Sequence, residues 1–322
     1  ISRRESIERI NLDGDKNSSL VLSHNLHLQN VVALAYDFKR HLIYYSDVKL
    51  NAICVCDFIG QTFIKLITDQ PIVEGLAFDP QNRHLFWTLN GEVEIRSFDL
   101  NKLDDETITT LDFQNSVTKI LSLKKGQDKL RAVVVEPCLN MLYYSNWNNK
   151  FPSISRIYVS GYGREDIITT EIVVPNALTI DLNDKKLFWA DARLDKIERC
   201  DYDGKNRVIL AQAALKHPFS IAVFEDYVFF SDWTLHAVVR ANKYSGNDVV
   251  FVSTAIEHPM GIVVAQDELR NCSNGLCDMF NGGCEDKCLP LGSNSFKCEC
   301  TQGFLAKDNR RCLSHNKTSS CN

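Results

Sequence analysis

A short motif, two aromatic residues followed by a small residue and usually an acid, occurs five times in this chain of 322 residues. The copies are Tyr44-Tyr45-Ser46-Asp47, Phe86-Trp87-Thr88-Leu89, Tyr143-Tyr144-Ser145-Asn146, Phe188-Trp189-Ala190-Asp191 and Phe229-Phe230-Ser231-Asp232, and their starts are 42, 57, 45 and 41 residues apart. A period near forty in β-type residues indicates one repeated supersecondary unit, most simply a blade of a β-propeller. We therefore expect an all-β fold.

Each unit has the same internal order of apolar runs and polar turns. In the fourth unit, Ala177 to Asp181 precedes the motif, Lys196 to Cys200 follows it, and Arg207 to Ala211 closes the unit. Short runs rich in Val, Ile, Phe and Tyr, bounded by Asp, Asn and Gly, predict β-strands. Each unit is therefore expected to form a four-stranded blade.

The two ends of the repeat region are complementary. The chain begins with an expected third strand, Ser6 to Leu12, and a fourth, Ser19 to Ser23, and the repeats end in an isolated first strand, Met260 to Ala265. Together they predict a sixth blade closed by both ends, whose second strand is expected before Ile1. Because such closure covers open sheet edges, we expect a six-bladed propeller over residues 1–270.

The composition changes after residue 270. Eight of the twelve cysteines lie between Cys272 and Cys321, and six have spacings typical of an epidermal growth factor-like module: Cys277, Cys284, Cys288, Cys298, Cys300 and Cys312. Fewer than fifty residues cannot bury an adequate core, so disulfides must stabilise the module. Spacing alone leaves fifteen pairings open. We assign the module to residues 271–314, and residues 315–322 to a tail or the start of a next module.

The connector from Ala265 to Leu276 is short and contains no proline or glycine-serine tract. We therefore expect the module to pack against the last blades, with Phe280, Leu289 or Phe296 burying apolar area there. Such packing would make the two parts one rigid unit.

Several features indicate an extracellular chain. The density of cysteines requires an oxidising compartment, and three Asn-x-Ser/Thr sequons, at Asn17, Asn271 and Asn316, are candidate glycosylation sites. The net charge of −5 with interspersed signs argues against nucleic acid as a partner. The sequence shows no signal peptide and no membrane-spanning stretch, so we expect an ectodomain piece that makes no contact with the membrane itself.

Motif repeats followed directly by a cysteine-rich module resemble the low-density lipoprotein receptor family. Further matches are Asn30-Val31-Val32-Ala33-Leu34, Pro175-Asn176-Ala177-Leu178-Thr179, His217-Pro218-Phe219-Ser220 and Asn281-Gly282-Gly283-Cys284. The motif is degenerate, because the family's Trp is replaced in three copies and its acid in two, as Tyr45, Tyr144, Phe230, Leu89 and Asn146 show.

The resemblance implies the extracellular part of a single-pass plasma-membrane receptor, which carries protein ligands such as lipoproteins into endosomes. It also implies the disulfide pairings Cys277–Cys288, Cys284–Cys298 and Cys300–Cys312. Two alternatives stay open: a signalling co-receptor that binds secreted growth factors on the propeller face, and a basement-membrane linker protein.

Histidine is where an acid-dependent mechanism would lie, since imidazole titrates between cell-surface and endosomal pH. In this family the propeller takes up the receptor's own acidic ligand-binding repeats at low pH, through two tryptophans and two histidines, and ligand is released. This chain keeps Trp147 and His217 of that set and has Val174 and Asp195 at the other two positions. His217 and Trp147 are therefore the candidate pH-switch residues.

Catalysis is not expected. The acids Asp47, Asp191 and Asp232 are equivalent in different repeats, which indicates acceptance of backbone hydrogen bonds rather than one active site with two carboxylates. The cysteine cluster lacks the paired Cys-x-x-Cys geometry of zinc sites, and the residues before Cys277 offer too few oxygen ligands for calcium. We expect no catalytic residue, no metal and no cofactor.

The sequence alone does not decide whether the remaining cysteines are free thiols or form disulfides. Cys54 and Cys56 lie two apart on one expected strand, where geometry is poor for a bridge, so buried thiols are the default. A bridge between Cys138 and Cys200 stays open, as does one between Cys272 and Cys321.

Overall fold

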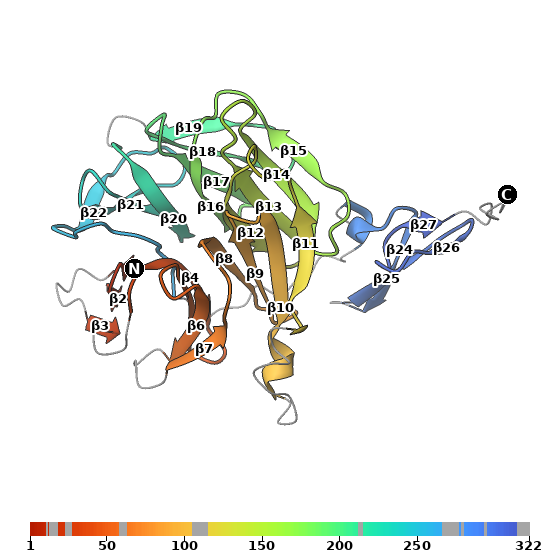
Figure 1. Cartoon of the computed structure of the whole chain (residues 1–322). Helices are drawn as coiled ribbons and strands as arrows, with labels where there is room; N and C mark the ends of the chain where they lie inside the picture. The colour runs from red at the N-terminus through yellow and green to blue at the C-terminus, as the bar shows by residue number, and fades with distance from the viewer. Residues whose placement is uncertain are drawn as a thin grey trace.

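The computed structural model describes residues 1–10, 12, 19–22, 28–57, 63–104, 115–211, 215–265, 277, 280–292 and 295–313. Its regular elements are β-strands and two short 3₁₀ segments, η2 (Leu100–Asp104) and η3 (Phe280–Gly283). Figure 1 shows the sheets arranged like blades around a central axis. Among these residues, no helix is long and apolar enough to span a bilayer.

Five four-stranded antiparallel sheets follow one another in chain order, which confirms the predicted all-β propeller. Each motif lies in the second strand of its blade, and all of its residues are buried, as expected for a central strand covered on both faces. The strands are β4 (Val31–Asp37), β5 (Leu42–Asp47), β6 (Ala52–Asp57) and β7 (Phe63–Ile67) in the first blade; β8 (Val73–Asp79), β9 (His84–Leu89), β10 (Glu94–Asp99) and β11 (Thr118–Ser122) in the second; β12 (Leu130–Glu136), β13 (Met141–Asn146), β14 (Ser153–Tyr158) and β15 (Glu165–Ile168) in the third; β16 (Pro175–Asp181), β17 (Lys186–Asp191), β18 (Lys196–Asp201) and β19 (Val208–Ala211) in the fourth; and β20 (Pro218–Phe224), β21 (Tyr227–Asp232), β22 (Ala237–Asn242) and β23 (Val250–Ser253) in the fifth.

The prediction of six complete blades is wrong. Beside the five blades stands a three-stranded sheet of β1 (Ser2–Arg3), β2 (Ser6–Arg9) and β3 (Ser19–Leu22), and the segment 260–265, expected to be a strand, is not one. The two ends of the repeat region nevertheless meet, because the Ser2 N–H donates to the Gly261 carbonyl at 2.8 Å and the Met260 N–H donates to the Ser2 carbonyl at 2.9 Å. β1 is only two residues long, so it pairs with this segment at one end only.

The aromatic pairs of the motifs form the contacts between blades. Successive side chains on a strand point to opposite faces, so the first aromatic of one blade packs with the second aromatic of the next. The four pairs in common clusters are Tyr44 with Trp87, Phe86 with Tyr144, Tyr143 with Trp189, and Phe188 with Phe230. An aromatic side chain buries roughly 150–250 Å², so at about 25 cal/mol per Å² the burial of each ring contributes about 4–6 kcal/mol to folding.

Three disulfides hold the C-terminal module, which contains β24 (Lys287–Gly292), β25 (Ser295–Glu299), β26 (Phe304–Leu305) and β27 (Cys312–Leu313). They join Cys277 to Cys288, Cys284 to Cys298, and Cys300 to Cys312, the pairings that the family resemblance implies.

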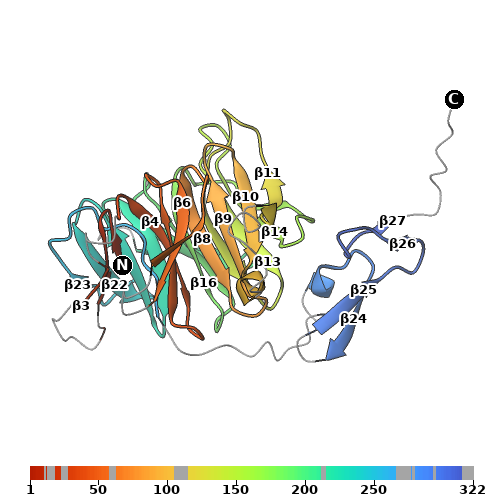
Figure 2. The same cartoon turned by 60° about the horizontal axis from the view of Figure 1, so that its bottom comes forward.

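The module contacts the third blade, so the expectation that it packs on the last blades is wrong. Figure 2 shows the module beside the propeller. The Arg310 guanidinium lies 5.9 Å from the ring centre of Tyr158, at the end of β14, and a Cβ placed on Gly283 would approach that ring to 2.6 Å. Phe296 packs under Arg310 at 4.6 Å instead of entering a blade. The side chains of Phe280 and Leu289 lie outside the described residues.

The propeller cysteines are mostly thiols. Cys54, Cys56 and Cys200 are free and buried, which excludes a bridge between Cys138 and Cys200. Cys138 is disulfide-bonded, to a partner outside the described residues. Also outside the described residues are Cys272 and Cys321 and the sequons at Asn17, Asn271 and Asn316.

Candidate functional site

Every motif ends at the same face of the propeller. The register pairs the end of each motif with the start of the preceding strand, as in Val31 with Asp47 and Pro218 with Asp232. The loops that follow the motifs and the loops that lead into the first strands therefore meet at one face, which we call the motif face.

The motif acids tie these two sets of loops together. One oxygen of the buried Asp232 accepts the N–H groups of Lys216 and His217, both at 2.9 Å, and the other accepts those of Thr234 and Leu235 at 2.9 and 3.0 Å. The acids of the first and fourth blades accept equivalent sets of four backbone N–H groups. These carboxylates are therefore structural, as their repetition predicted.

The repeats stop resembling one another at the mouth of the central channel. Each first strand has a β-bulge near its start, and a bulge redirects the side chain at that point. The five residues at these positions line a channel of about 310 Å³, and we call them the mouth ring: Val32, Glu74, Arg131, Asn176 and Phe219. Five equivalent positions thus carry an aliphatic, an acidic, a basic, an amide and an aromatic side chain.

Three members of the mouth ring interact across the channel. Arg131 Nη1 lies 3.3 Å from Glu74 Oε1, and the Arg131 guanidinium carbon lies 4.7 Å from the ring centre of Phe219. Glu74 also accepts a hydrogen bond from Asn90 at 3.1 Å. Burial raises the pKa of the Glu74 carboxyl, and Arg131 opposes this effect. Glu74 therefore takes up a proton at a higher pH than an ordinary glutamate.

His217 belongs to an aromatic cluster beside this ring. Its imidazole centre is 5.6 Å from that of Trp233, which stacks on Phe219 at 4.8 Å and meets His258 edge-on at 6.1 Å. We call His217, Phe219, Trp233 and His258 the aromatic platform. His217, Trp233 and His258 are half-buried, so a partner can reach part of each ring.

Trp147 lies on the same face but in a different place. It follows β13 in the third blade, and the Lys129 ammonium lies 4.3 Å from its ring centre. His217 precedes β20 in the fifth blade and packs on Trp233 instead. The structure therefore does not bring the two candidates into one cluster, although Arg131 and Phe219 connect their blades across the channel mouth.

Sequence reasoning missed the mouth ring and the partners of His217. The ring has no common residue type, so a search for repeated residues passes over it. A positional signal does exist, because in the first four blades the ring residue stands fourteen positions before the small residue of the motif. In the described part of the chain, no three His, Cys, Asp or Glu side chains are grouped to hold a metal ion.

Known proteins resemble this chain in sequence and in fold. The family model for the low-density lipoprotein receptor repeat class B matches residues 140–182 and 185–225. The Homo sapiens low-density lipoprotein receptor-related protein 5 is 28% identical over 306 residues, which cover 93% of this chain and 18% of that protein. The chain thus spans less than a fifth of this relative.

Solved structures share the propeller fold. A chain of the nidogen/laminin complex has a TM-score of 0.70 at 21% identity, covering 83% of this chain and 97% of that one. A gluconolactonase from Xanthomonas campestris has a TM-score of 0.58 at 14% identity, covering 72% of this chain and 78% of that one. At these identities the likeness shows the fold alone.

Proposed function

Because this chain belongs to the low-density lipoprotein receptor family, we propose that it is a non-enzymatic, protein-binding part of the extracellular region of an endocytic receptor. We further propose that partners bind on the motif face. The propeller chain solved in the nidogen/laminin complex supports the idea that this fold serves protein recognition.

The observation that carries the proposal is the break in repetition at the channel mouth. Positions that hold the blades together repeat from blade to blade, whereas the mouth ring carries five different chemistries. Beside it, the half-buried Trp233 offers an aromatic ring that is stacked on the buried Phe219, and Arg131 offers a cation next to Phe219. Aromatic residues and arginine are the residue types enriched in protein interfaces and their hot spots.

Acidification would make the motif face more positive. Histidine is the usual pH-responsive side chain of proteins, and the aromatic platform contains two, His217 and His258. Glu74 has a raised pKa, so its carboxylate is protonated more readily as the pH falls. Protonation of Glu74 removes the negative charge that partly neutralises the Arg131 guanidinium. The face would then attract acidic partners and repel basic ones. This change supports uptake of the receptor's own acidic ligand-binding repeats and release of ligand in endosomes.

The test measures binding of a calcium-loaded, acidic ligand-binding repeat of the family to this chain at pH 7.4 and pH 5.5. We expect at least tenfold tighter binding at pH 5.5, and a smaller ratio for His217→Ala. His84→Ala is the matched control, since His84 is half-buried at the start of β9, on the opposite face. Equal affinity at both pH values in the wild type would refute the acid switch. If His217→Ala keeps the full pH dependence of binding, that dependence originates at His258 or Glu74 instead.

A second candidate is a basement-membrane linker, since a chain of the nidogen/laminin complex has the same fold. This role and that of a co-receptor for secreted growth factors use the same face but need a partner that stays bound. For both alternatives, we expect a ligand whose affinity is unchanged at pH 5.5. Trp233→Ala should weaken binding under every one of these roles, so pH dependence is the measurement that separates them.

A further inference from the structure

The loop that follows the motif is longer in the third blade than in the other four. Residues 147–152 join β13 to β14, whereas the same connection is made in the other blades by residues 48–51, 90–93, 192–195 and 233–236. The longer loop carries Phe151, which at 77% is the most exposed of the large apolar side chains in the described part of the chain. A single exposed ring needs no explanation by itself, but the neighbours of this one are also unusual.

A hydrogen-bonded hub joins this loop to the loop that leads from β11 into the third blade. One oxygen of Asp128 accepts the NH₂ group of the buried Asn148 at 3.1 Å, and the other accepts the Lys124 N–H at 3.0 Å. Asn148 Oδ1 in turn accepts the backbone N–H groups of Lys150 and Phe151 at 2.9 and 3.2 Å. The two loops therefore form one unit that is fixed from within.

This unit is rich in lysine. Residues 123–129 and 147–152 contain Lys124, Lys125, Lys129 and Lys150. Lys125 pairs with Glu92, whereas the other three make no ion pair with any residue that the structure describes. The Lys129 ammonium lies 4.3 Å from the ring centre of Trp147 and 3.4 Å from Asn149 Oδ1. We call Lys124, Lys129, Trp147, Lys150 and Phe151 the lysine surface.

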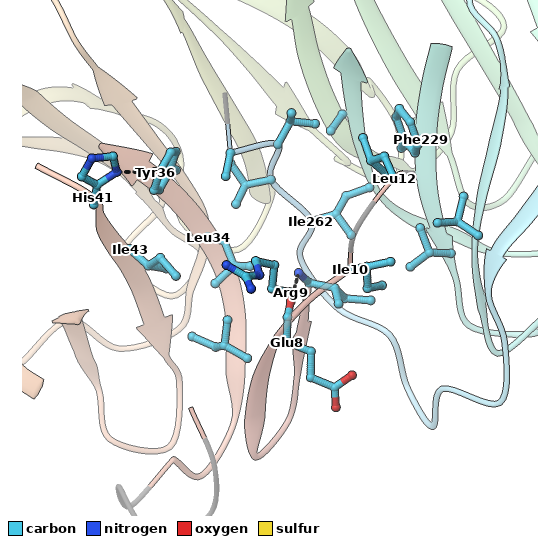
Figure 3. A pocket seen from close by; sticks show the side chains of 18 residues that line it. Glu8, Arg9, Ile10, Leu12, Leu34, Tyr36, His41, Ile43, Phe229 and Ile262 are labelled. Carbon is cyan, nitrogen blue, oxygen red and sulfur yellow. Dashed lines mark hydrogen bonds between the residues drawn. The ribbon is translucent and has the colours of Figure 1, made fainter. Parts of the chain in front are cut away.

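The hollows of the propeller suit an anion less well than this surface. At the mouth of the channel, Arg131 is already 3.3 Å from the Glu74 carboxylate. A second cavity, of about 540 Å³, lies beside the three-stranded sheet, and Figure 3 shows mostly apolar side chains around it, among them Leu34, Ile43 and Phe229. Burying a charge among such side chains is costly. Of these three places, the lysine surface is the one with uncompensated cations.

The side chains of the two loops also indicate which kind of anion fits. The unpaired cations are lysines, which act as point charges toward sulfate, whereas recognition of carboxylates favours the planar fork of arginine. Gln127 and Asn149 are exposed and bring amide groups that hydrogen-bond to hydroxyls. Trp147 and Phe151 bring aromatic faces against which the C–H groups of a sugar ring pack. A sulfated sugar chain presents all three complementary groups.

We propose that the lysine surface is a binding site for a sulfated glycosaminoglycan chain. Its lysines contact sulfates, its amides contact hydroxyls, and Phe151 packs on a sugar ring. The site lies on the third blade, whereas the aromatic platform lies on the fifth. It does not depend on the role proposed for His217, and the test uses no ligand-binding repeat.

The experiment measures binding of a heparin dodecasaccharide to the full chain at several salt concentrations. The affinity of a linear polyanion falls with nearly one power of the salt concentration for each cation engaged. For three lysines we therefore expect a loss of roughly 40-fold between 50 and 200 mM salt. Lys124→Gln/Lys150→Gln should weaken binding roughly tenfold or more and lower the salt exponent by about two.

Two further variants separate this site from a general effect of charge. Lys39→Gln/Lys307→Gln is the matched control, because it removes the same charge from exposed lysines outside the lysine surface, and it should leave the affinity within about twofold of the wild type. Phe151→Ala removes no charge, so it should weaken binding a few-fold and leave the salt exponent unchanged. Since Phe151 is so exposed, its removal should also leave Tm unchanged.

Three outcomes would overturn the proposal. In the first, the control variant loses as much affinity as Lys124→Gln/Lys150→Gln, so that only net charge matters. In the second, polyglutamate of the same total charge displaces the dodecasaccharide at equal concentration, which would make the surface a site for acidic protein segments instead. In the third, the dodecasaccharide does not bind the wild type even at 50 mM salt.

Discussion

Asp232→Asn tests whether the motif acid supports the loop that carries His217. The substitution keeps one oxygen, which still accepts the N–H groups of Thr234 and Leu235. The new NH₂ group faces the N–H groups of Lys216 and His217, which lose their acceptor. A buried donor left without a partner costs roughly 1–3 kcal/mol, so with two such donors we expect a loss of about 2–6 kcal/mol in the free energy of unfolding.

The third blade shows how an asparagine is tolerated at this place. Asn146 accepts the Lys129 N–H at 2.9 Å, and its NH₂ group donates to Asp128 at 2.8 Å. Asp128 and Lys216 hold equivalent positions, so Lys216→Asp should restore about half of the stability lost in Asp232→Asn. This coupling is the double-mutant-cycle signature of a direct interaction.

Urea unfolding of the wild type, the two single variants and the double variant measures both effects. Asp191→Asn is the matched control: it should lose similar stability but leave binding at the aromatic platform unchanged, since Asp191 supports a different loop. The reasoning is refuted if Asp232→Asn unfolds within about 0.5 kcal/mol of the wild type, or if Lys216→Asp is equally stabilising without it.

Two further predictions concern the module contact and the thiols. Gly283→Ala should weaken the contact between the module and the third blade, because the new Cβ would lie 2.6 Å from the Tyr158 ring. The measurement is the rate of proteolysis within residues 277–313, which should rise. Gly126→Ala is the control, since Gly126 also has a positive φ but faces open space, and it should leave that rate unchanged. Burial raises the pKa of each free thiol to about 12, so at pH 8 only about one in ten thousand is ionised, and a thiol reagent should label them only after unfolding; labelling of the native chain within minutes would contradict this for Cys54, Cys56 and Cys200.

The sequence predicts the parts of this molecule that repeat. Aromatic pairs at a period near forty indicate blades, because a central strand needs one large side chain for each neighbour, and Tyr44 and Trp87 meet as that logic requires. The motif acids could be assigned to backbone support for the same reason. A resemblance, rather than any physical argument, supplied the disulfide pairings.

The sequence does not predict the parts of the structure that do not repeat. The sixth sheet depends on how far β1 extends along its neighbours, and an isolated apolar run at residues 260–265 does not reveal that. The platform around His217 requires Phe219 to be turned by a bulge onto Trp233, and a bulge has no residue signature in a single sequence. The contact of Arg310 with Tyr158 joins segments about 150 residues apart through one ring and one cation, which no local pattern encodes.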